Sequence, residues 1–232
     1  MRRNLGFKSI STEYSLFAFD DFANRKGLAS ITITKELADE WCQRRPNEAT
    51  DTWGHRNCFL RQFSIYLFNI GYETYIPLKL PTKRDNTFIP YIYSDQELQA
   101  IYQACDSLVL YNKNAQSMLM ILPALIRTLA GTGIRIGEAV NLRCKDVNLE
   151  QNYLVLKGCK NGKDRIVPIS DSLADVCVQY RKYRELLPRH SDYFFVKLNG
   201  CACLAKSFSC WWKIILNKAG IKQRGDIVGP RI

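Results

Sequence analysis

The pattern of apolar and polar positions predicts helices in the first part of the chain. Apolar side chains recur there every three or four residues, as they do on the buried face of an amphipathic helix. These side chains are Leu16, Phe19, Phe22, Leu37, Trp41, Phe59, Phe63, Tyr66 and Leu67. The expected N-terminal residues of three helices are Thr12 or Ser15, Thr34 and Thr52. Gly27 ends the first helix and Gly71 the third, so residues 12–76 are expected to form a helical unit with an aromatic core.

Residues 77–90 interrupt this pattern. They hold three prolines and show no period. Because proline has no N–H donor for a helix or a sheet, they predict an extended linker. Lys79, Lys83 and Arg84 make the segment basic. Two interpretations are open: a strap that crosses a DNA backbone, or a plain solvated linker.

Residues 91–232 mix helical and alternating segments. Ser94 opens a capping-box pattern before an apolar helix. Further helices are expected over 115–130, from about Arg135, over 171–187 and over 204–219. Strands are expected over 153–157, 165–169 and 193–196, the first two as a hairpin. Gly131 and Gly133 are expected to end the buried helix, and Asp171 to cap the helix after the hairpin. The predicted fold class is mainly α with a small antiparallel β-sheet.

The charge of the chain indicates a polyanionic partner. The 232 residues carry a formal net charge of +11, and the excess of Lys and Arg lies mostly after residue 80. Nucleic acid is the most common partner of such a surface. A basic surface that is only solvated is the alternative.

Composition also indicates the cellular compartment and whether a cofactor is expected. No apolar run approaches the roughly 18 residues of a membrane span, and the start lacks the apolar segment of a signal peptide. Nine cysteines at irregular spacing fit free thiols in a reducing cytoplasm. Cys201 and Cys203 lack the spacing and the second pair of a zinc site. No metal or other cofactor is therefore expected.

Arg135 is the first candidate for phosphate chemistry. It follows a Gly-Thr-Gly break at an expected helix start, where unpaired backbone N–H groups favour an anion. A guanidinium adds a planar, two-pronged grip on phosphate oxygens. Glu138 lies three residues on, on the same helical face, where it can hold the arginine in one rotamer. An ordinary surface ion pair is the alternative.

Lys160, Lys163 and Arg165 place three cations at the tip and edge of the expected hairpin. A tip lysine can reach a leaving oxygen and give it a proton, and the other two can grip a DNA backbone. A basic solvated turn is the alternative. On the third expected helix, Arg56 and Arg61 face away from the apolar side, where they either touch phosphates or are solvated.

The order and spacing of these residues resemble the tyrosine recombinases, the phage-integrase and Xer-type family. The matching stretches are Thr-Gly-Ile-Arg-Ile-Gly-Glu-Ala-Val-Asn-Leu over 132–142, Asp-Val-Asn over 146–148 and Lys-Asn-Gly-Lys-Asp-Arg-Ile-Val-Pro over 160–168. Residues 91–232 are similar to the family's catalytic domain. Residues 12–76 look like its helical core-binding domain, with residues 1–11 as an N-terminal tail.

The resemblance implies site-specific recombination, or integration, of a mobile element. In this family two domains clamp duplex DNA, and a tyrosine attacks the phosphate to form a 3′-phosphotyrosyl bond without a metal. Arg135 matches the first arginine that stabilises the phosphate, and Glu138 matches its supporting acid. Lys160 matches the lysine that protonates the 5′-oxygen, with Lys163 as the second choice. The implied assembly of the complete protein is a homotetramer on DNA.

The chain departs from the family pattern at two catalytic positions. The His-x-x-Arg motif and the nucleophilic tyrosine are not found, because His55, His190 and all 12 tyrosines lie in other contexts. We therefore expect a fragment, truncated before that motif, which binds DNA without cleaving it. A non-catalytic DNA-binding protein of the same fold, acting as competitor or architectural factor, is the alternative. A metal-dependent nuclease is disfavoured, because the acidic residues of the second part are scattered.

Overall fold

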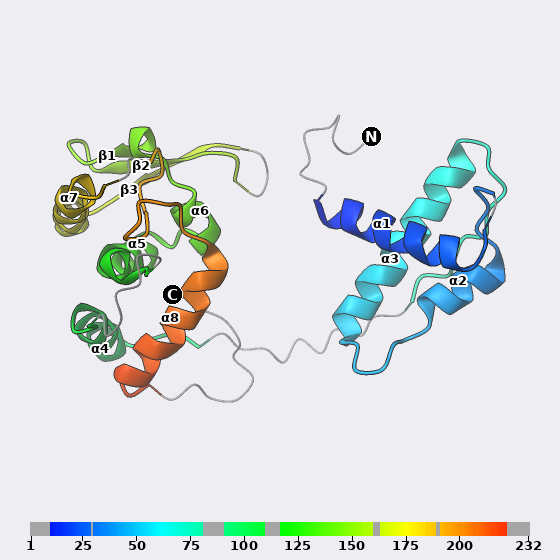
Figure 1. The fold of residues 1–232 in the computed structure, drawn as a ribbon, viewed down its shortest axis with the longest axis horizontal. Helices are drawn as coiled ribbons and strands as arrows, with labels where there is room; N and C mark the ends of the chain where they lie inside the picture. The colour runs from blue at the N-terminus through cyan, green and yellow to red at the C-terminus, as the bar shows by residue number, and fades with distance from the viewer. Residues whose placement is uncertain are drawn as a thin grey trace. The chain divides into compact units, whose positions relative to one another are not determined.

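The computed structural model describes residues 10–28, 30–80, 91–109, 117–159, 163–188 and 191–221. The chain divides into unit 1, residues 1–88, and unit 2, residues 89–232 (Figure 1). Three predicted site residues, Lys83, Arg84 and Lys160, lie outside the described residues. No helix within the described ranges is long and apolar enough to cross a membrane.

The described residues of unit 1 form three helices and an extended segment. The helices are α1 (Ile10–Arg25), α2 (Lys35–Cys42) and α3 (Thr50–Asn69), and residues 72–80 follow without helix or strand. The Thr34 hydroxyl accepts a hydrogen bond from the Leu37 N–H at 3.2 Å, so the predicted start of α2 is confirmed. Gly27 and Gly71 follow α1 and α3 with φ angles of 70° and 93°, where glycine is favoured because it has no Cβ.

The predicted starts of α1 and α3 are wrong. α1 begins at Ile10, so the Thr12 and Ser15 hydroxyls cannot cap it, and that of Ser15 bonds to a carbonyl one turn earlier at 3.0 Å. α3 begins at Thr50 and not at Thr52. A serine or threonine inside a helix gives the same sequence signal as one at its start, because the hydroxyl can satisfy either backbone group.

Unit 1 has an aromatic core. The Phe19 ring meets Trp41 edge-on with centroids 5.1 Å apart and Phe63 with centroids 6.0 Å apart. The buried line of α3 runs through Asn57, Leu60, Ser64 and Leu67. The predicted apolar face of α3 is confirmed for Leu67, which is buried, and for Phe59 and Phe63, which pack against this core. It is wrong for Tyr66, which is 47% exposed.

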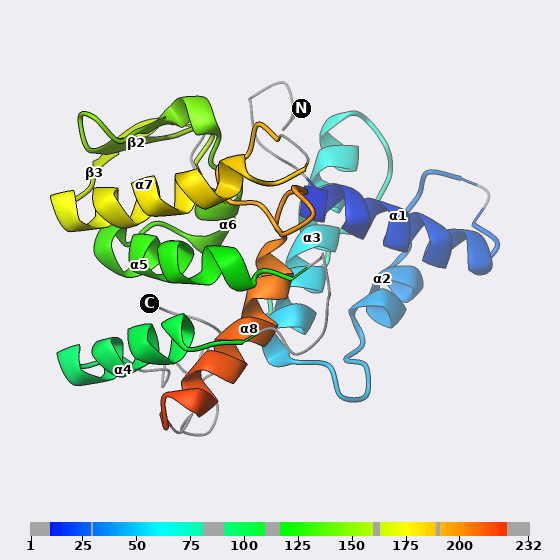
Figure 2. The same cartoon turned by 60° about the vertical axis from the view of Figure 1, so that its left-hand side comes forward.

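Unit 2 places a small sheet against a layer of helices. Its described helices are α4 (Asp95–Asp106), α5 (Leu122–Thr132), α6 (Ile136–Val140), α7 (Asp171–Glu185) and α8 (Ala205–Lys218), with short 3-10 helices η2 (Leu119–Ile121) and η3 (Cys144–Asp146). The strands β1 (Val147–Asn148), β2 (Tyr153–Leu156) and β3 (Arg165–Pro168) are antiparallel in the order β1-β2-β3. The sheet lies on the side of α5 and α7, and α4 packs against α5 and α8 (Figures 1 and 2). The predicted fold class and the Ser94 capping box are confirmed.

Two predicted helix boundaries in unit 2 need correction. The helix predicted over 115–130 starts as α5 only at Leu122, because Pro123 has no N–H to donate and fits only the first turn. α7 is capped by Ser170 and not by Asp171, which is the first residue of the helix. The Ser170 hydroxyl accepts an N–H from the first turn at 3.3 Å.

Residues 193–196 do not form the predicted third strand and make only isolated bridges. On one side of the segment the Phe194 N–H bonds to the Leu142 carbonyl at 2.8 Å, and on the other the Tyr180 hydroxyl takes the place of a neighbouring strand. This hydroxyl donates a hydrogen bond to the Phe194 carbonyl and accepts one from the Val196 N–H, both at 3.0 Å. The third strand of the sheet is instead β1, which the sequence pattern does not indicate because it has only two residues.

Candidate functional site

Arg135 stands at the break between α5 and α6. Gly133 ends α5 with a φ angle of 64°, and its N–H bonds to the Leu129 carbonyl at 2.9 Å. Gly131, which was also predicted to end this helix, lies inside it. Ile134 is 4% exposed and anchors the break to the core. Arg135 is then the N-cap of α6, with extended φ and ψ angles of −73° and 146°, so the predicted helix start is confirmed.

Glu138 holds Arg135 and Arg165 with one carboxylate. Its Oε2 accepts the Arg135 backbone N–H at 2.9 Å, and its Oε1 accepts Nη1 of Arg135 at 3.1 Å. From the other side, Arg165 donates Nη1 to Oε1 at 3.3 Å and Nη2 to Oε2 at 2.9 Å. The Glu138 side chain is 12% exposed, while those of Arg135 and Arg165 are 61% and 41% exposed. We define these three residues as the arginine cluster.

Glu138 is ionised at neutral pH. Burial by itself would raise the pKa of this carboxyl. The hydrogen bonds from the Arg135 backbone and side chain, together with the charge and hydrogen bonds of Arg165, outweigh burial and hold the pKa below its ordinary value. The described hydrogen bonds of the Arg135 guanidinium use Nη1 alone. Its other N–H groups are left as charged donors, the kind that phosphate oxygens accept strongly.

Polar contacts close the base of the β2–β3 hairpin beside the arginine cluster. Leu156 pairs with Arg165 in the sheet register. The Asp164 carboxylate accepts the Gly158 N–H at 2.8 Å, so it replaces a rung of the ladder where the strands part. Lys163 follows the hairpin tip and is exposed. The hairpin base is therefore fixed, and its cations differ: Arg165 is paired with Glu138, whereas Lys163 faces solvent.

Lys157, just after β2, is a cation that the sequence pattern did not single out. Its Nζ lies 2.8 Å from Oδ1 of Asp146, whose side chain is 8% exposed. The hydrogen bond and the charge of Asp146 raise the pKa of Lys157 above its ordinary value. Lys157 therefore fastens β2 to the segment before β1 and is engaged within the protein.

Arg56 and Arg61, the predicted phosphate contacts of unit 1, are both bound within that unit. Arg56 donates Nε and Nη2 to Glu48 at 3.0 and 2.7 Å, and its side chain is 10% exposed. The alternative interpretation, a solvated charge, is therefore wrong for Arg56. Arg61 donates Nη1 to the Pro77 carbonyl at 2.5 Å. Lys79 is exposed and lines, with Arg61, a groove beside α3.

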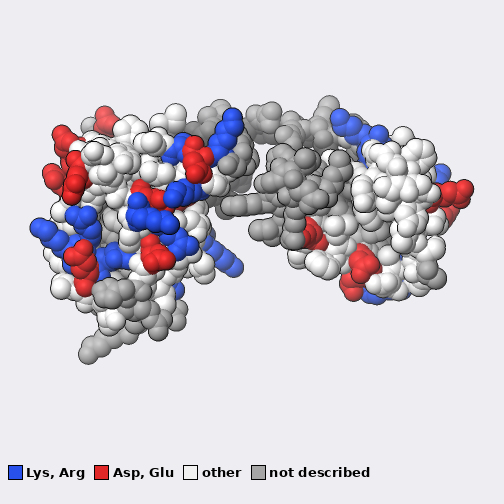
Figure 3. Space-filling model, turned by 90° about the horizontal axis from the view of Figure 1, so that it is seen from above, with Lys and Arg blue, Asp and Glu red and all other residues white. Residues whose placement is uncertain are grey.

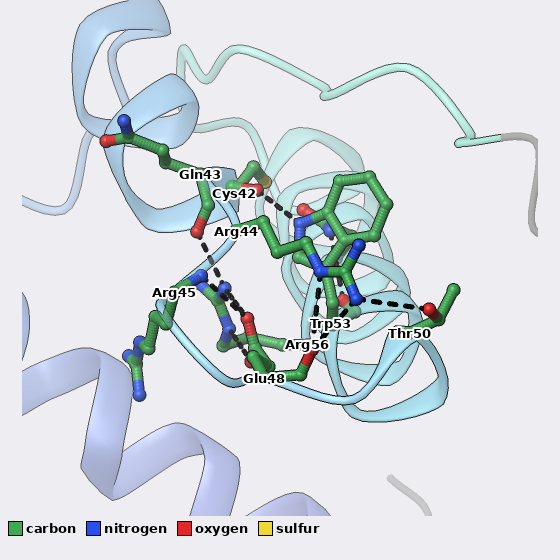
Figure 4. Close-up of polar contacts among 9 residues, drawn as sticks. Cys42, Gln43, Arg44, Arg45, Glu48, Thr50, Trp53 and Arg56 are labelled. Atoms are coloured by element: carbon green, nitrogen blue, oxygen red, sulfur yellow. Dashed lines mark hydrogen bonds and ion pairs between the residues drawn. The ribbon is translucent and has the colours of Figure 1, made fainter.

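Arg56 donates hydrogen bonds to the turn between α2 and α3 and holds it together (Figure 4). Nη2 of Arg56 also donates to the Gln43 carbonyl at 2.8 Å, and the Arg45 N–H donates to the Glu48 carboxylate at 3.1 Å. Arg44 crosses the same turn and donates Nη2 to the Glu48 carbonyl at 3.0 Å. The sequence pattern did not identify Glu48. It lies in the turn before α3, where no helical spacing relates it to Arg56 within α3.

The surface of unit 2 carries many basic side chains on the face drawn in Figure 3. Lys and Arg lie across that face with acidic side chains among them, on the side where Figure 1 places the sheet and α6. The arginine cluster and the hairpin base belong to these elements. The candidate site therefore belongs to elements on a side of unit 2 where basic and acidic side chains are mixed.

The chain belongs to the phage integrase family, whose model matches residues 92–228, more than half of the sequence. The match includes the break at Arg135, Glu138 and the whole hairpin. The resemblance to tyrosine recombinases that the motifs carry is thereby confirmed.

Similar proteins carry the names of recombinases. The putative integrase/recombinase y4rB of Sinorhizobium fredii is 29% identical over 239 residues, which cover 100% of this chain and 74% of that protein. Tyrosine recombinase XerA of Pyrococcus horikoshii is 31% identical over 119 residues, which cover 51% of this chain and 36% of that protein. The crystal structure of the XerH site-specific recombinase bound to palindromic difH substrate, a post-cleavage complex, has a TM-score of 0.65 at 21% identity and covers 84% of this chain and 55% of that one. The chain spans only part of each of these proteins, and the likeness to XerH supports the fold.

Proposed function

We propose that the chain takes part in site-specific recombination of duplex DNA, as a tyrosine recombinase that moves or integrates a mobile element. The arginine cluster carries this proposal, because it presents an ordered guanidinium at a helix start beside a basic hairpin. Membership of the phage integrase family supports it. So does the likeness in fold to XerH, which was solved with its DNA substrate.

Each cation of the site has its own task in the proposed reaction. In the complete protein, a tyrosine oxygen loses its proton to solvent and forms a bond to the scissile phosphorus, and the bond from phosphorus to the 5′-oxygen breaks. Arg135 binds the non-bridging oxygens and offsets the charge that develops on them in the transition state. Glu138 fixes the rotamer of Arg135. Lys160 gives its proton to the leaving 5′-oxygen, with Lys163 as the second choice.

Both units contribute to DNA binding in this proposal. Residues 12–76 serve as a core-binding domain and residues 91–232 as the catalytic domain, with the linker 77–90 between them and four copies assembled on DNA. The proposed contacts to the DNA backbone are Arg61, Lys79, Lys83, Arg84 and Lys163. Arg56 contributes indirectly, because it holds the turn before α3.

Salt dependence tests the DNA partner. Every phosphate contact releases counterions, so the logarithm of the binding constant should fall with the logarithm of the salt concentration by about 0.9 for each contact. Lys79→Gln should lower this slope by about 1. Lys26→Gln is the matched control, because Lys26 is paired with Glu40. Mobility shifts of duplex DNA that do not depend on salt, or no binding at low salt, would contradict the proposal.

A second assay tests recombination in cells that carry the whole gene from which residues 1–232 come, because these residues alone are not expected to supply the nucleophile. Joined ends of the element are detected by amplification across the new junction. Junctions should form with the unchanged gene and be absent with Arg135→Ala, while the purified Arg135→Ala variant still binds duplex DNA. If DNA binding persists but junctions form with neither gene, the non-catalytic alternative is favoured.

A further inference from the structure

We infer that Arg165 is a positioning residue of the phosphate site, which acts through Glu138 on Arg135 and does not itself contact DNA. This inference rests on the proposed function for the identity of the ligand, and it changes the role that the sequence pattern gave to Arg165. The evidence is that the Glu138 carboxylate binds both Arg135 and Arg165, the latter 27 positions further along the chain.

The Glu138 carboxylate is saturated. Each oxygen accepts one N–H from Arg135 and one from Arg165, at distances between 2.9 and 3.3 Å. A carboxylate offers about four acceptor sites. The bonds from Arg135 are local to the start of α6, whereas those from Arg165 come from β3. Arg165 therefore fixes the carboxylate relative to the sheet, and the carboxylate in turn fixes the Arg135 side chain.

The geometry of Arg165 argues against a direct grip on DNA. Both of its terminal nitrogens bind Glu138 in a two-pronged arrangement, which arginine also often uses to bind a phosphate. Binding a phosphate in that way would release Glu138, which is 12% exposed, from one of its two cations. Arg135 uses only Nη1 on the same carboxylate and is 61% exposed, so it is the arginine that can accept a ligand.

The charged groups that face Glu138 in the described residues are Arg135, from the start of α6, and Arg165, from β3. Both hold its pKa down against the effect of burial. Without Arg165, the remaining support comes from Arg135 alone. The carboxylate then becomes protonated at a higher pH, and a protonated Glu138 no longer attracts the Arg135 guanidinium as an ion.

Titration of the Glu138 carboxyl carbon by NMR tests this support directly, on the full chain without DNA. We expect Arg165→Gln to raise the pKa of Glu138 and Arg165→Lys to raise it less, because lysine restores the charge but not the two-pronged bond. Lys163→Gln is the matched control: it removes the same charge from the same hairpin but has no described contact with Glu138. If Arg165→Gln and Lys163→Gln leave Glu138 with the same pKa, the inference is wrong.

A double-mutant cycle in DNA binding separates positioning from direct contact. If Arg165 acts through Arg135 and makes no phosphate contact, adding Arg165→Gln to Arg135→Gln should leave the salt slope of duplex binding unchanged. If Arg165 contacts a phosphate itself, the slope falls by about 1 more, which overturns the inference. Absence of DNA binding by the unchanged chain would contradict the proposed function, whereas the titration of Glu138 would still decide the role of Arg165.

Discussion

Glu48 and Arg56 form a two-pronged ion pair inside unit 1. Nε of Arg56 lies 3.0 Å from Oε1 of Glu48, and Nη2 lies 2.7 Å from Oε2. Only 7% of the Glu48 side chain and 10% of the Arg56 side chain are exposed. Charges in such a place depend mainly on each other, because little water can reach them.

Glu48→Gln should lower the free energy of unfolding of unit 1 by about 2 kcal/mol, somewhat less than the loss of one partner from a fully buried pair. Urea unfolding followed through the NMR signals of α3 measures this change. Glu40→Gln is the control. The side chains of Lys26 and Glu40 are 45% and 47% exposed, so their ion pair should contribute less than about 0.5 kcal/mol. Equal losses in the two variants would contradict the prediction.

The same pair should make unit 1 sensitive to acid. Hydrogen bonds from Arg56 hold the pKa of Glu48 below its ordinary value, although partial burial opposes them. Such a carboxyl stabilises the folded state above its unfolded pKa of about 4.3, and this contribution is lost as the pH falls through the folded pKa. Between about pH 6 and pH 3, the unchanged chain should therefore lose more stability than Glu48→Gln. If the free energy of unfolding falls equally with pH in the unchanged chain and in Glu48→Gln, this role of Glu48 is excluded.

Two glycines on either side of Arg135 should respond to alanine in opposite directions. Gly133 has a φ angle of 64°, so Gly133→Ala should destabilise the protein by about 1 kcal/mol even though no atom lies within 4 Å of the added Cβ. Gly137 lies inside α6, and there too the Cβ meets nothing within 4 Å. Gly137→Ala should therefore stabilise the protein by about 0.5 kcal/mol. Urea midpoints that move in the same direction would contradict this account.

Residues 1–232 should form no covalent bond to DNA. Among the described tyrosines, none has a hydrogen bond to Arg135, Glu138 or Arg165. The Tyr180 hydroxyl is bound to the backbone on both sides, and burial raises its pKa, so it cannot act as a nucleophile. Incubation with nicked duplex DNA followed by a denaturing gel checks this. A DNA-linked protein band that disappears when one tyrosine is replaced by phenylalanine would overturn the prediction.

Local signals in the sequence predicted most elements of the fold. Thr34 and Ser94 have side chains that cap the helix next to them, and Gly27 and Gly71 end helices because their φ angles suit glycine. The hairpin followed from two runs of strand-forming residues around a turn. Such features depend on neighbours in sequence, so they can be recognised without a structure.

Contacts between distant segments explain what the sequence pattern missed. Residues 193–196 have the composition of a strand, but the Tyr180 hydroxyl binds two of their backbone groups where a neighbouring strand would. Arg56 has the spacing of an exposed cation, yet Glu48 encloses it. Arg135 and Glu138 are neighbours on one helix turn and were paired from spacing alone. The pairing of Glu138 with Arg165 has no periodic signal, because the hairpin lies between them.

The shared carboxylate also sets how much charge the arginine cluster shows to solvent. Two guanidiniums and one carboxylate leave a net charge of one, although the cluster contains two cations. Attraction of a polyanion grows with each uncompensated cation, whereas alignment of Arg135 needs the anion beside it. The negative charge of Glu138 therefore lowers the affinity for DNA, whereas the alignment of Arg135 depends on that charge. A neutral residue at this position would let the protein hold any DNA more tightly while aiming Arg135 less well.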